Sequence, residues 1–155
     1  SADALRFTLL SMASPGRDVK LSEDRVKGYR NFLNKIWNAN NLLKQNDCNF
    51  DEIEKPKELK VNINKWIISE YYSINNQIKQ NIKDYRFDEA ARNAYLFVCH
   101  SFCYWYLELS KTILYSDDTS SIEEVKKVSA YIFREILIIL HPFIPFVPED
   151  IWLNN

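Results

Sequence analysis

Amide and cationic side chains recur at helical spacing in the stretch YRNFLNKIWNANNLLKQN, residues 29–46, and they are the groups in this sequence best suited to binding chemistry. Asparagine is a mediocre helix former, because its amide competes for backbone hydrogen bonds. From Arg25 to Asn46 there are five basic residues and no acidic one. At about 100° per residue, an arc of roughly 140° on one helix face holds Lys27, Arg30, Asn31, Asn34, Lys35, Asn38 and Asn41.

A face of this kind suits RNA. Lysine and arginine pair with phosphates, and an asparagine amide donates and accepts together at a base edge. Bases in an RNA loop are splayed, which leaves those edges open. The SPGRD turn just upstream adds Arg17, a forked donor, and Asp18, an acceptor for exocyclic amines such as that of cytosine. The pattern predicts RNA contact; the alternative is an ordinary solvated face, because asparagine is common elsewhere in the chain.

Other chemistry is poorly represented. The stretch CHSFC places Cys99 and Cys103 one helical turn apart, but a metal site needs four ligands and no second cluster follows. Buried structural cysteines are therefore expected. Two glycines cannot build a phosphate-binding loop, and nothing in the sequence looks catalytic. Part of one aromatic cluster is expected to contact a neighbouring module: Phe102, Tyr104, Trp105 and Tyr106.

Composition limits the remaining possibilities. The 155 residues are 46% hydrophobic, which is enough for one globular core, and a formal net charge of −1 does not by itself indicate a nucleic-acid partner. Three cysteines argue for a reducing, cytoplasmic compartment. The longest apolar run, residues 136–140, is far too short to span a membrane, so no membrane partner is expected.

The hydrophobic periodicity predicts helices only. We expect a short helix over 1–14 and long ones over 22–46, 62–83, 88–115 and 121–140. Asp88 is the expected N-cap of the fourth helix, and Ser121 with Glu124 fits a capping box for the fifth. The expected apolar seam of the second helix is Val26, Tyr29, Leu33, Ile36, Trp37 and Leu43. These elements predict an all-α, antiparallel helical bundle forming a single domain over residues 1–155.

The two ends of the sequence suggest a piece of a longer protein. The first residue already stands at a helix start. The last stretch, PEDIWLNN, opens a new helix at Pro148 and stops after one turn.

Three stretches together resemble one family. SADALRFTLLSMASPGRDVKLSEDRVKGYRNFLNKIWNA is similar to the segment that follows the catalytic domain of the valyl-tRNA synthetases, which are class I aminoacyl-tRNA synthetases. YRFDEAARNAYLFVCHSFCYWYLELSK and LHPFIPFVPEDIW resemble later helices of the same domain. The likeness covers essentially all residues in order, and SPGRD followed by GYRNF and NKIWNA is its most specific part.

The resemblance implies an anticodon-binding helical bundle of an enzyme that attaches valine to its tRNA using ATP and magnesium. HIGH-type and KMSKS-type motifs are absent from this sequence, so no catalytic site, cofactor or metal is expected in it. The catalytic, editing and C-terminal coiled-coil parts would lie outside it. The implied partners are the anticodon loop of the valine tRNA and the catalytic domain of the same chain, in a monomeric cytoplasmic enzyme.

The resemblance also implies site residues. By similarity to the methionyl relatives, the positions of Asn34 and Asn38 face the anticodon. The full expected set is Arg17, Asp18, Arg30, Asn31, Asn34, Lys35, Asn38 and Lys111. Phe32 would stack on a base if it were exposed. Two alternatives remain open: the same bundle from an isoleucyl, leucyl or methionyl sister enzyme, which would prefer another anticodon, and a helical protein-interaction domain that binds no RNA.

Overall fold

Helices make up the regular structure of the part of the chain that the computed structural model describes, residues 1–50 and 53–154. One helix runs continuously through α4 (Phe87–Leu96), a π-helix η1 (Phe97–Tyr106) and α5 (Leu107–Leu114). The others are α1 (Ala2–Met12), α2 (Glu23–Gln45), α3 (Asn62–Lys83), α6 (Thr119–Leu140) and α7 (Phe146–Leu153). The predicted all-α class is confirmed.

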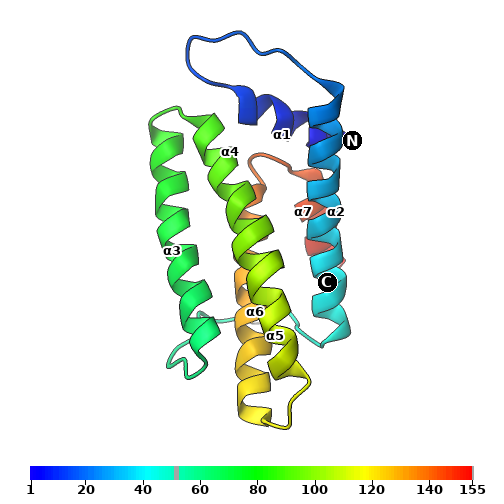
Figure 1. Ribbon diagram of the computed structural model, residues 1–155, viewed down its shortest axis with the longest axis vertical. Coiled ribbons are helices and arrows are strands. Elements are labelled where there is room, and N and C mark those ends of the chain that lie inside the picture. The colour runs from blue at the N-terminus through cyan, green and yellow to red at the C-terminus, as the bar shows by residue number, and fades with distance from the viewer. Residues whose placement is uncertain (51–52, 155) are drawn as a thin grey trace.

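The long helices lie side by side and alternate in direction (Figure 1). α3 packs against α4 and α6, α5 packs against α6, and α2 packs against η1 and α6. α1 lies across one end of the bundle, where it contacts α2 and α4, while α7 packs against α2 and α6. This arrangement is the antiparallel bundle that the sequence predicts.

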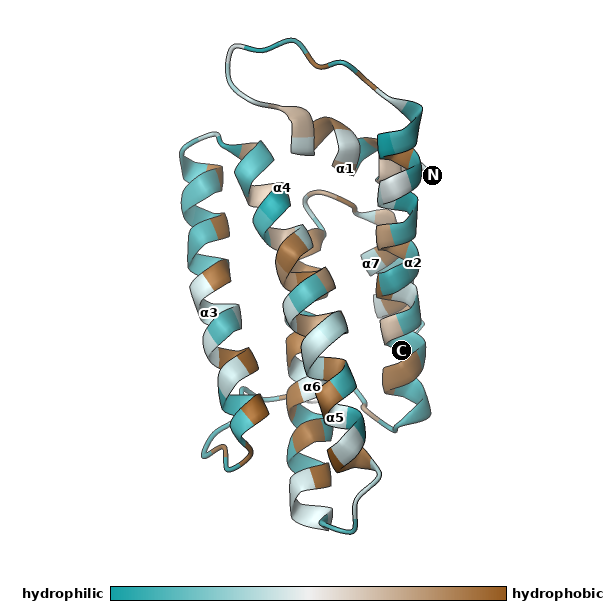
Figure 2. Cartoon of the chain, viewed as in Figure 1, coloured by the Kyte–Doolittle hydropathy of each residue, from teal (hydrophilic) through white to brown (hydrophobic). Residues whose placement is uncertain are grey.

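Burial of one apolar face per helix drives this packing. Along each long helix, hydrophobic and hydrophilic residues alternate as a one-sided apolar stripe requires (Figure 2). An aromatic row joins three helices, because the ring of Phe32 lies 5.1 Å from that of Phe7 and 5.1 Å from that of Tyr95. Within the described residues, no helix is long and apolar enough to cross a membrane. The largest apolar contribution is from α6: Val125, Val128, Ala130, Ile132, Phe133, Ile136, Leu137 and Leu140.

A carboxylate of α6 organises the start of α3. Glu124 Oε1 accepts hydrogen bonds from the backbone N–H of Val61 at 3.0 Å and from Asn64 Nδ2 at 2.9 Å. Its Oε2 accepts from the backbone N–H of Lys60 at 2.9 Å. Asn64 in turn accepts from Tyr106 Oη at 2.7 Å. One polar path, buried at Asn64 and Tyr106, therefore joins α6, α3 and the last residue of η1.

The expected capping box of Ser121 and Glu124 is wrong. Asp118 is the N-cap of α6, and its carboxylate accepts from the backbone N–H of Ser121 at 3.2 Å and from the Ser121 hydroxyl at 2.6 Å. Glu124 is instead bound to the start of α3, which has no side-chain cap of its own and offers three N–H donors. Unpaired N–H groups at a helix start need such an acceptor, and here another helix supplies it.

Neither α2 nor α3 ends at a glycine. Asp47 and Tyr85 follow their last turns with φ of 55° and 56°, a region that glycine usually occupies. The backbone N–H of Cys48 then bonds to the carbonyl of Leu43 at 2.9 Å, which satisfies an end carbonyl of α2. Sharp helix ends are thus made in a chain that has two glycines.

A buried carboxylate of α1 connects the short helices α1 and α7. Asp3 is 1% exposed, and its carboxylate accepts from the backbone N–H groups of Phe146 at 3.2 Å and Val147 at 2.7 Å. An acid suits this place, because the first turn of a helix carries partial positive charge. Arg6 donates to the carbonyl of Phe143 at 3.3 Å. These bonds fix the position of α1 and therefore of the turn that follows it, which begins at Ser14.

The middle of the long helix differs from the expected α-helix. η1 is a ten-residue π-helix, whose wider turn changes which side chains share a face. Phe102 and Tyr106 are 0% exposed, while Tyr104 and Trp105 are 62% and 53% exposed. The predicted aromatic cluster is therefore divided into a buried pair and an exposed pair.

Replacing Tyr106 with Phe should lower the free energy of unfolding by about 1–3 kcal/mol, because the carbonyl of Asn64 keeps its buried position and loses the 2.7 Å bond. Urea denaturation measures the change. Tyr104→Phe is the matched control: its ring is 62% exposed, and we expect a change below about 0.5 kcal/mol. Equal losses in the two variants would contradict the role of the buried bond.

Candidate nucleic-acid interface

The polar face of α2 is open to solvent. Lys27 forms an ion pair with Asp24 at 3.8 Å, but both side chains are exposed and such pairs are weak. Within the described residues, no hydrogen-bond or ion-pair partner of the side chain exists for five exposed members of the face: Arg30, Asn31, Asn34, Lys35 and Asn38. The amides therefore have no internal role in the bundle that accounts for them, and they are free to bind an external ligand.

One expectation for α2 is wrong, and the condition of another is not met. Phe32 would stack on a base only if it were exposed, but it is 2% exposed and packs against Phe7 and Tyr95. Trp37, which was expected in the apolar seam, is 41% exposed. The reason is that Phe7 of α1 and Tyr95 of α4 pack on the side of α2 that holds Phe32, so the buried stripe lies away from Trp37.

A groove adjoins the polar face. Its volume is about 610 Å³, within the range of small-molecule sites. One wall belongs to α2 and consists of Lys35, Asn38, Ala39 and Leu42. The other wall belongs to η1 and α5 and consists of Cys103, Tyr104, Trp105, Leu107, Glu108 and Leu109. The groove thus brings a cation and an amide opposite two exposed aromatic rings.

Lys111 lies beside this groove rather than in it. Its ammonium group donates to Glu108 Oε1 at 2.7 Å, and Glu108 lines the groove. The pair offsets the negative charge of Glu108, which would otherwise repel phosphate. The structure therefore brings Lys111 to the same region as Lys35 and Asn38, although α3, α4 and η1 lie between them in the sequence.

The predicted SPGRD turn is a β-turn of the type that requires glycine at its third position. The backbone N–H of Arg17 bonds to the carbonyl of Ser14 at 3.4 Å, and Gly16 has φ of 73°. Proline at the second position and glycine at the third are typical of a type II turn. Arg17 and Asp18 follow directly and are exposed. Neither residue lines the groove.

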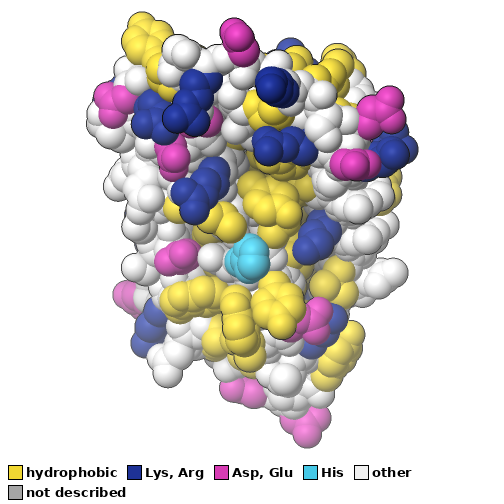
Figure 3. Space-filling model, turned by 45° about the horizontal axis from the view of Figure 1, so that its top comes forward, with side chains coloured by type: hydrophobic (Ala, Val, Ile, Leu, Met, Phe, Trp, Pro, Cys, Tyr) yellow, Lys and Arg dark blue, Asp and Glu magenta, His cyan; other side chains and the backbone are white. Residues whose placement is uncertain are grey.

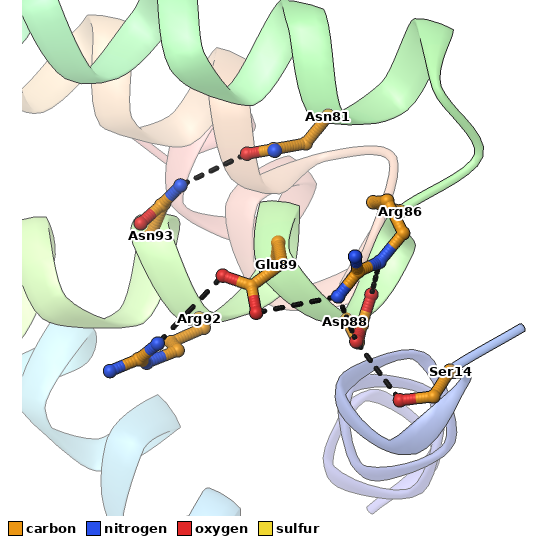
Figure 4. A network of polar contacts seen from close by, with 7 residues as sticks. All are labelled: Ser14, Asn81, Arg86, Asp88, Glu89, Arg92 and Asn93. Atoms are coloured by element: carbon orange, nitrogen blue, oxygen red, sulfur yellow. Dashed lines mark hydrogen bonds and ion pairs between the residues drawn. The ribbon is translucent and has the colours of Figure 1, made fainter.

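An ionic network holds the first residue of this turn (Figure 4). Ser14 Oγ donates to Asp88 Oδ2 at 3.0 Å, and Arg86 donates to both oxygens of Asp88 at 3.1 Å. Arg86 also pairs with Glu89 at 3.5 Å. The Arg86 guanidinium lowers the pKa of the Asp88 carboxyl to about 2, and Ser14 adds to this effect.

Asp88 was expected to be the N-cap of the fourth helix, and this is wrong. The N-cap of α4 is Arg86, and Asp88 stands in the first turn. From that position its carboxylate accepts from Arg86 through both oxygens and from Ser14, which follows the end of α1. The acid therefore connects the start of α4 to the turn after α1.

The surface around these elements combines apolar and cationic groups. Figure 3 shows a band of exposed hydrophobic side chains with Lys and Arg side chains on its borders. Exposed aromatic rings beside cations are typical of proteins that bind single-stranded nucleic acid, since rings stack on bases and cations contact phosphates. All Asp and Glu residues of the chain lie outside residues 25–46.

Among the described residues, no group of three or more His, Cys, Asp or Glu could hold a metal ion. Burial raises the pKa of the Cys103 thiol to about 12, so it carries no thiolate at neutral pH. Cys99 is buried as expected, whereas Cys103 is half-buried and lines the groove.

Comparison with known proteins decides the family. Residues 64–155 match the family described as the anticodon-binding domain of tRNA ligase. The chain belongs to this family. The matched range begins in α3 and includes η1, α5, α6 and α7, so it contains one wall of the groove.

The similarity to individual relatives extends over α2 as well. The chain is 69% identical over 155 residues to a valine–tRNA ligase of Pelagibacter ubique. This match covers 100% of the chain and 18% of the relative. It is 45% identical over 154 residues to that of Zymomonas mobilis, covering 97% and 17%, and 43% identical over 151 residues to that of Bradyrhizobium diazoefficiens, covering 97% and 16%. The chain thus spans less than a fifth of the length of these curated relatives.

The groove contains residues that sequence reasoning did not include in the site. Part of the cluster Phe102, Tyr104, Trp105 and Tyr106 was expected to contact a neighbouring module, and in the structure Tyr104 and Trp105 line the groove together with Lys35 and Asn38. A regular helix over residues 88–115 gives no means of knowing which ring of FCYWY faces α2. The only signal was the density of aromatic residues itself, which exceeds what one buried face of a helix needs.

The two glycines should respond oppositely to substitution by alanine. Gly16→Ala should destabilise the chain by about 1–2 kcal/mol, because φ of 73° strains any residue with a Cβ. Gly28→Ala, inside α2 with no atom within 4 Å of the new Cβ, should stabilise it by about 0.5–1 kcal/mol. Urea denaturation of both variants checks this, and changes of the same sign would contradict the turn assignment.

Asp88 should make stability depend on pH at the acid end. Its folded pKa of about 2 lies below the ordinary value of 3.8, so its stabilisation is complete above about pH 4 and is lost as pH falls towards 2. Wild type and Asp88→Asn should therefore differ in the free energy of unfolding at pH 7 and converge near pH 2. Urea denaturation across this range tests it; a difference that does not change with pH would show that Asp88 is not paired.

Proposed function

We propose that this chain is the anticodon-binding part of a valine–tRNA ligase and that it binds the anticodon loop of the valine tRNA through α2 and the adjoining groove. One observation carries the proposal: a row of unpartnered amides, Asn31, Asn34 and Asn38, which leads into a groove walled by Tyr104 and Trp105. The names of the relatives, all of them valine–tRNA ligases, support the choice of valine.

Recognition of the bases rests on amides and an acid. Valine codons begin with GU, so valine anticodons end in adenine and then cytosine. An asparagine amide can pair with the donor and the acceptor of adenine together, and Asp18 can accept from the exocyclic amine of cytosine. A wrong base leaves such groups unpaired, at a cost of about 1–3 kcal/mol each.

Positioning of the loop rests on cations and aromatic rings. Arg17, Arg30 and Lys35 are exposed cations that would bind phosphates and fix the register of the loop. In the groove, an unstacked base would gain about 1–3 kcal/mol from stacking on an aromatic ring. The chain thereby raises the specificity of the enzyme through binding, while the bonds are made and broken elsewhere.

The chemical steps belong to the remainder of the enzyme. Attachment of valine to tRNA needs ATP and magnesium, and we place both in the catalytic part of the same chain, outside residues 1–155. We propose a monomeric, cytoplasmic enzyme. The free thiols Cys48, Cys99 and Cys103 agree with a reducing compartment.

The test compares two anticodon stem-loops that bind the isotopically labelled chain, one with the valine anticodon and one with only its middle adenine replaced. We expect NMR shifts in residues 17–41 and an affinity loss of roughly 5- to 150-fold on replacement, from about 1–3 kcal/mol per wrong base. Asn34→Ala should reduce this discrimination. Lys35→Ala should weaken both loops alike and lower the salt dependence by about one phosphate contact.

Asn76→Ala is the matched control, because Asn76 is an exposed asparagine on α3. It should leave both affinities unchanged. Equal, purely salt-dependent binding of the two loops would reduce the role of α2 to phosphate contact. Preference for another anticodon would assign the bundle to a sister synthetase, and failure of the full-length enzyme to distinguish the loops would favour a protein-interaction role.

A further inference from the structure

We infer that Asp88 is a positioning residue for RNA binding, which acts by holding the Ser14–Arg17 turn so that Arg17 and Asp18 face the anticodon loop. This inference rests on the proposed function. Nothing in the sequence links Asp88 to the turn, because 74 positions separate it from Ser14. The link exists only in the folded bundle, where α1 packs against α4.

Two hydrogen bonds in series connect the carboxylate to Arg17. Asp88 Oδ2 accepts from the hydroxyl of Ser14 at 3.0 Å, and the carbonyl of Ser14 accepts from the backbone N–H of Arg17 at 3.4 Å. Arg86 keeps the carboxylate in place through two bonds of 3.1 Å. Because both carboxylate oxygens are engaged by Arg86 and one also accepts from Ser14, the carboxylate has little freedom to rotate. The start of the turn is therefore fixed to α4.

The rest of the turn has no other such anchor. Within the described residues, the side chains from 15 to 21 make no hydrogen bond or ion pair, and all seven residues are exposed. Ser14, by contrast, is half-buried. A connection of this length would sample many conformations without an anchor, and binding would then have to fix them at a cost in entropy.

The consequence is that Arg17 is presented to the RNA before binding. An arginine held near its bound position loses less conformational freedom when it pairs with a phosphate or a base. Removing the anchor should leave the contact available and make it weaker. The effect of Asp88 on RNA must therefore pass through Arg17, and this dependence separates a positioning role from a purely structural one.

The experiment measures binding of the valine tRNA to the full-length ligase that contains this chain. Asp88→Asn and Ser14→Ala should each weaken binding about 3- to 10-fold, as expected for losing the pre-ordering of one or two side chains. Ser14→Ala removes one hydroxyl and leaves the Arg86 pair intact, so it tests the anchor even if Asp88→Asn unfolds the enzyme. Glu89→Gln is the control: it touches the same arginine, has no bond to Ser14, and should leave affinity unchanged.

A double-mutant cycle decides whether the effect passes through the turn. In an Arg17→Ala background, Ser14→Ala and Asp88→Asn should cause no further loss of affinity. Full additivity, or normal affinity in Ser14→Ala, would overturn the inference while the base discrimination of the wild type stays in place. Loss of that discrimination in the wild type would instead overturn the proposed function, and this inference with it.

Discussion

The buried path from Glu124 through Asn64 to Tyr106 is the interaction on which the rest of the molecule depends. Glu124 takes up the backbone N–H groups at the start of α3, and Asn64 passes the connection to the hydroxyl of Tyr106. Tyr106 is the last residue of η1, so its fixed position sets the rotation of the two preceding rings. While Tyr106 is held in the core by Asn64 of α3 and Glu124 of α6, Tyr104 and Trp105 line the groove.

The separation of charge within the chain explains how a protein with a net charge of −1 can present a basic surface. Acids are absent between Arg25 and Asn46, and elsewhere several of them are consumed by internal contacts, as Asp3, Glu124 and Asp88 are. An acid bound to backbone N–H groups or to arginine contributes little field at the polar face of α2. Net charge therefore says little here about what each face of the bundle binds.

The sequence predicted the fold well because the helices are long and strongly periodic. The exposed face of α2 followed from spacing alone, and Asn31, Asn34 and Asn38 are all exposed. The failures have a common cause in contacts between helices. Glu124 fits a local capping box in the sequence, but in the structure it accepts hydrogen bonds from the start of α3. Phe32 is buried by side chains of α1 and α4, and no pattern within α2 can reveal those contacts. The groove could not be predicted, since η1 rotates its rings out of the α-helical register.

The π-helix also determines which changes of length this segment tolerates. A substitution within Phe97–Tyr106 leaves the number of residues between α4 and α5 intact. An insertion or deletion of one residue would rotate everything beyond it by about 100° around the helix axis. Glu108 and Lys111 would then leave the edge of the groove, and Tyr106 would leave Asn64. The length of the segment from Phe87 to Leu114 therefore determines which side chains line the groove, and we expect related sequences to substitute residues within it without changing its length.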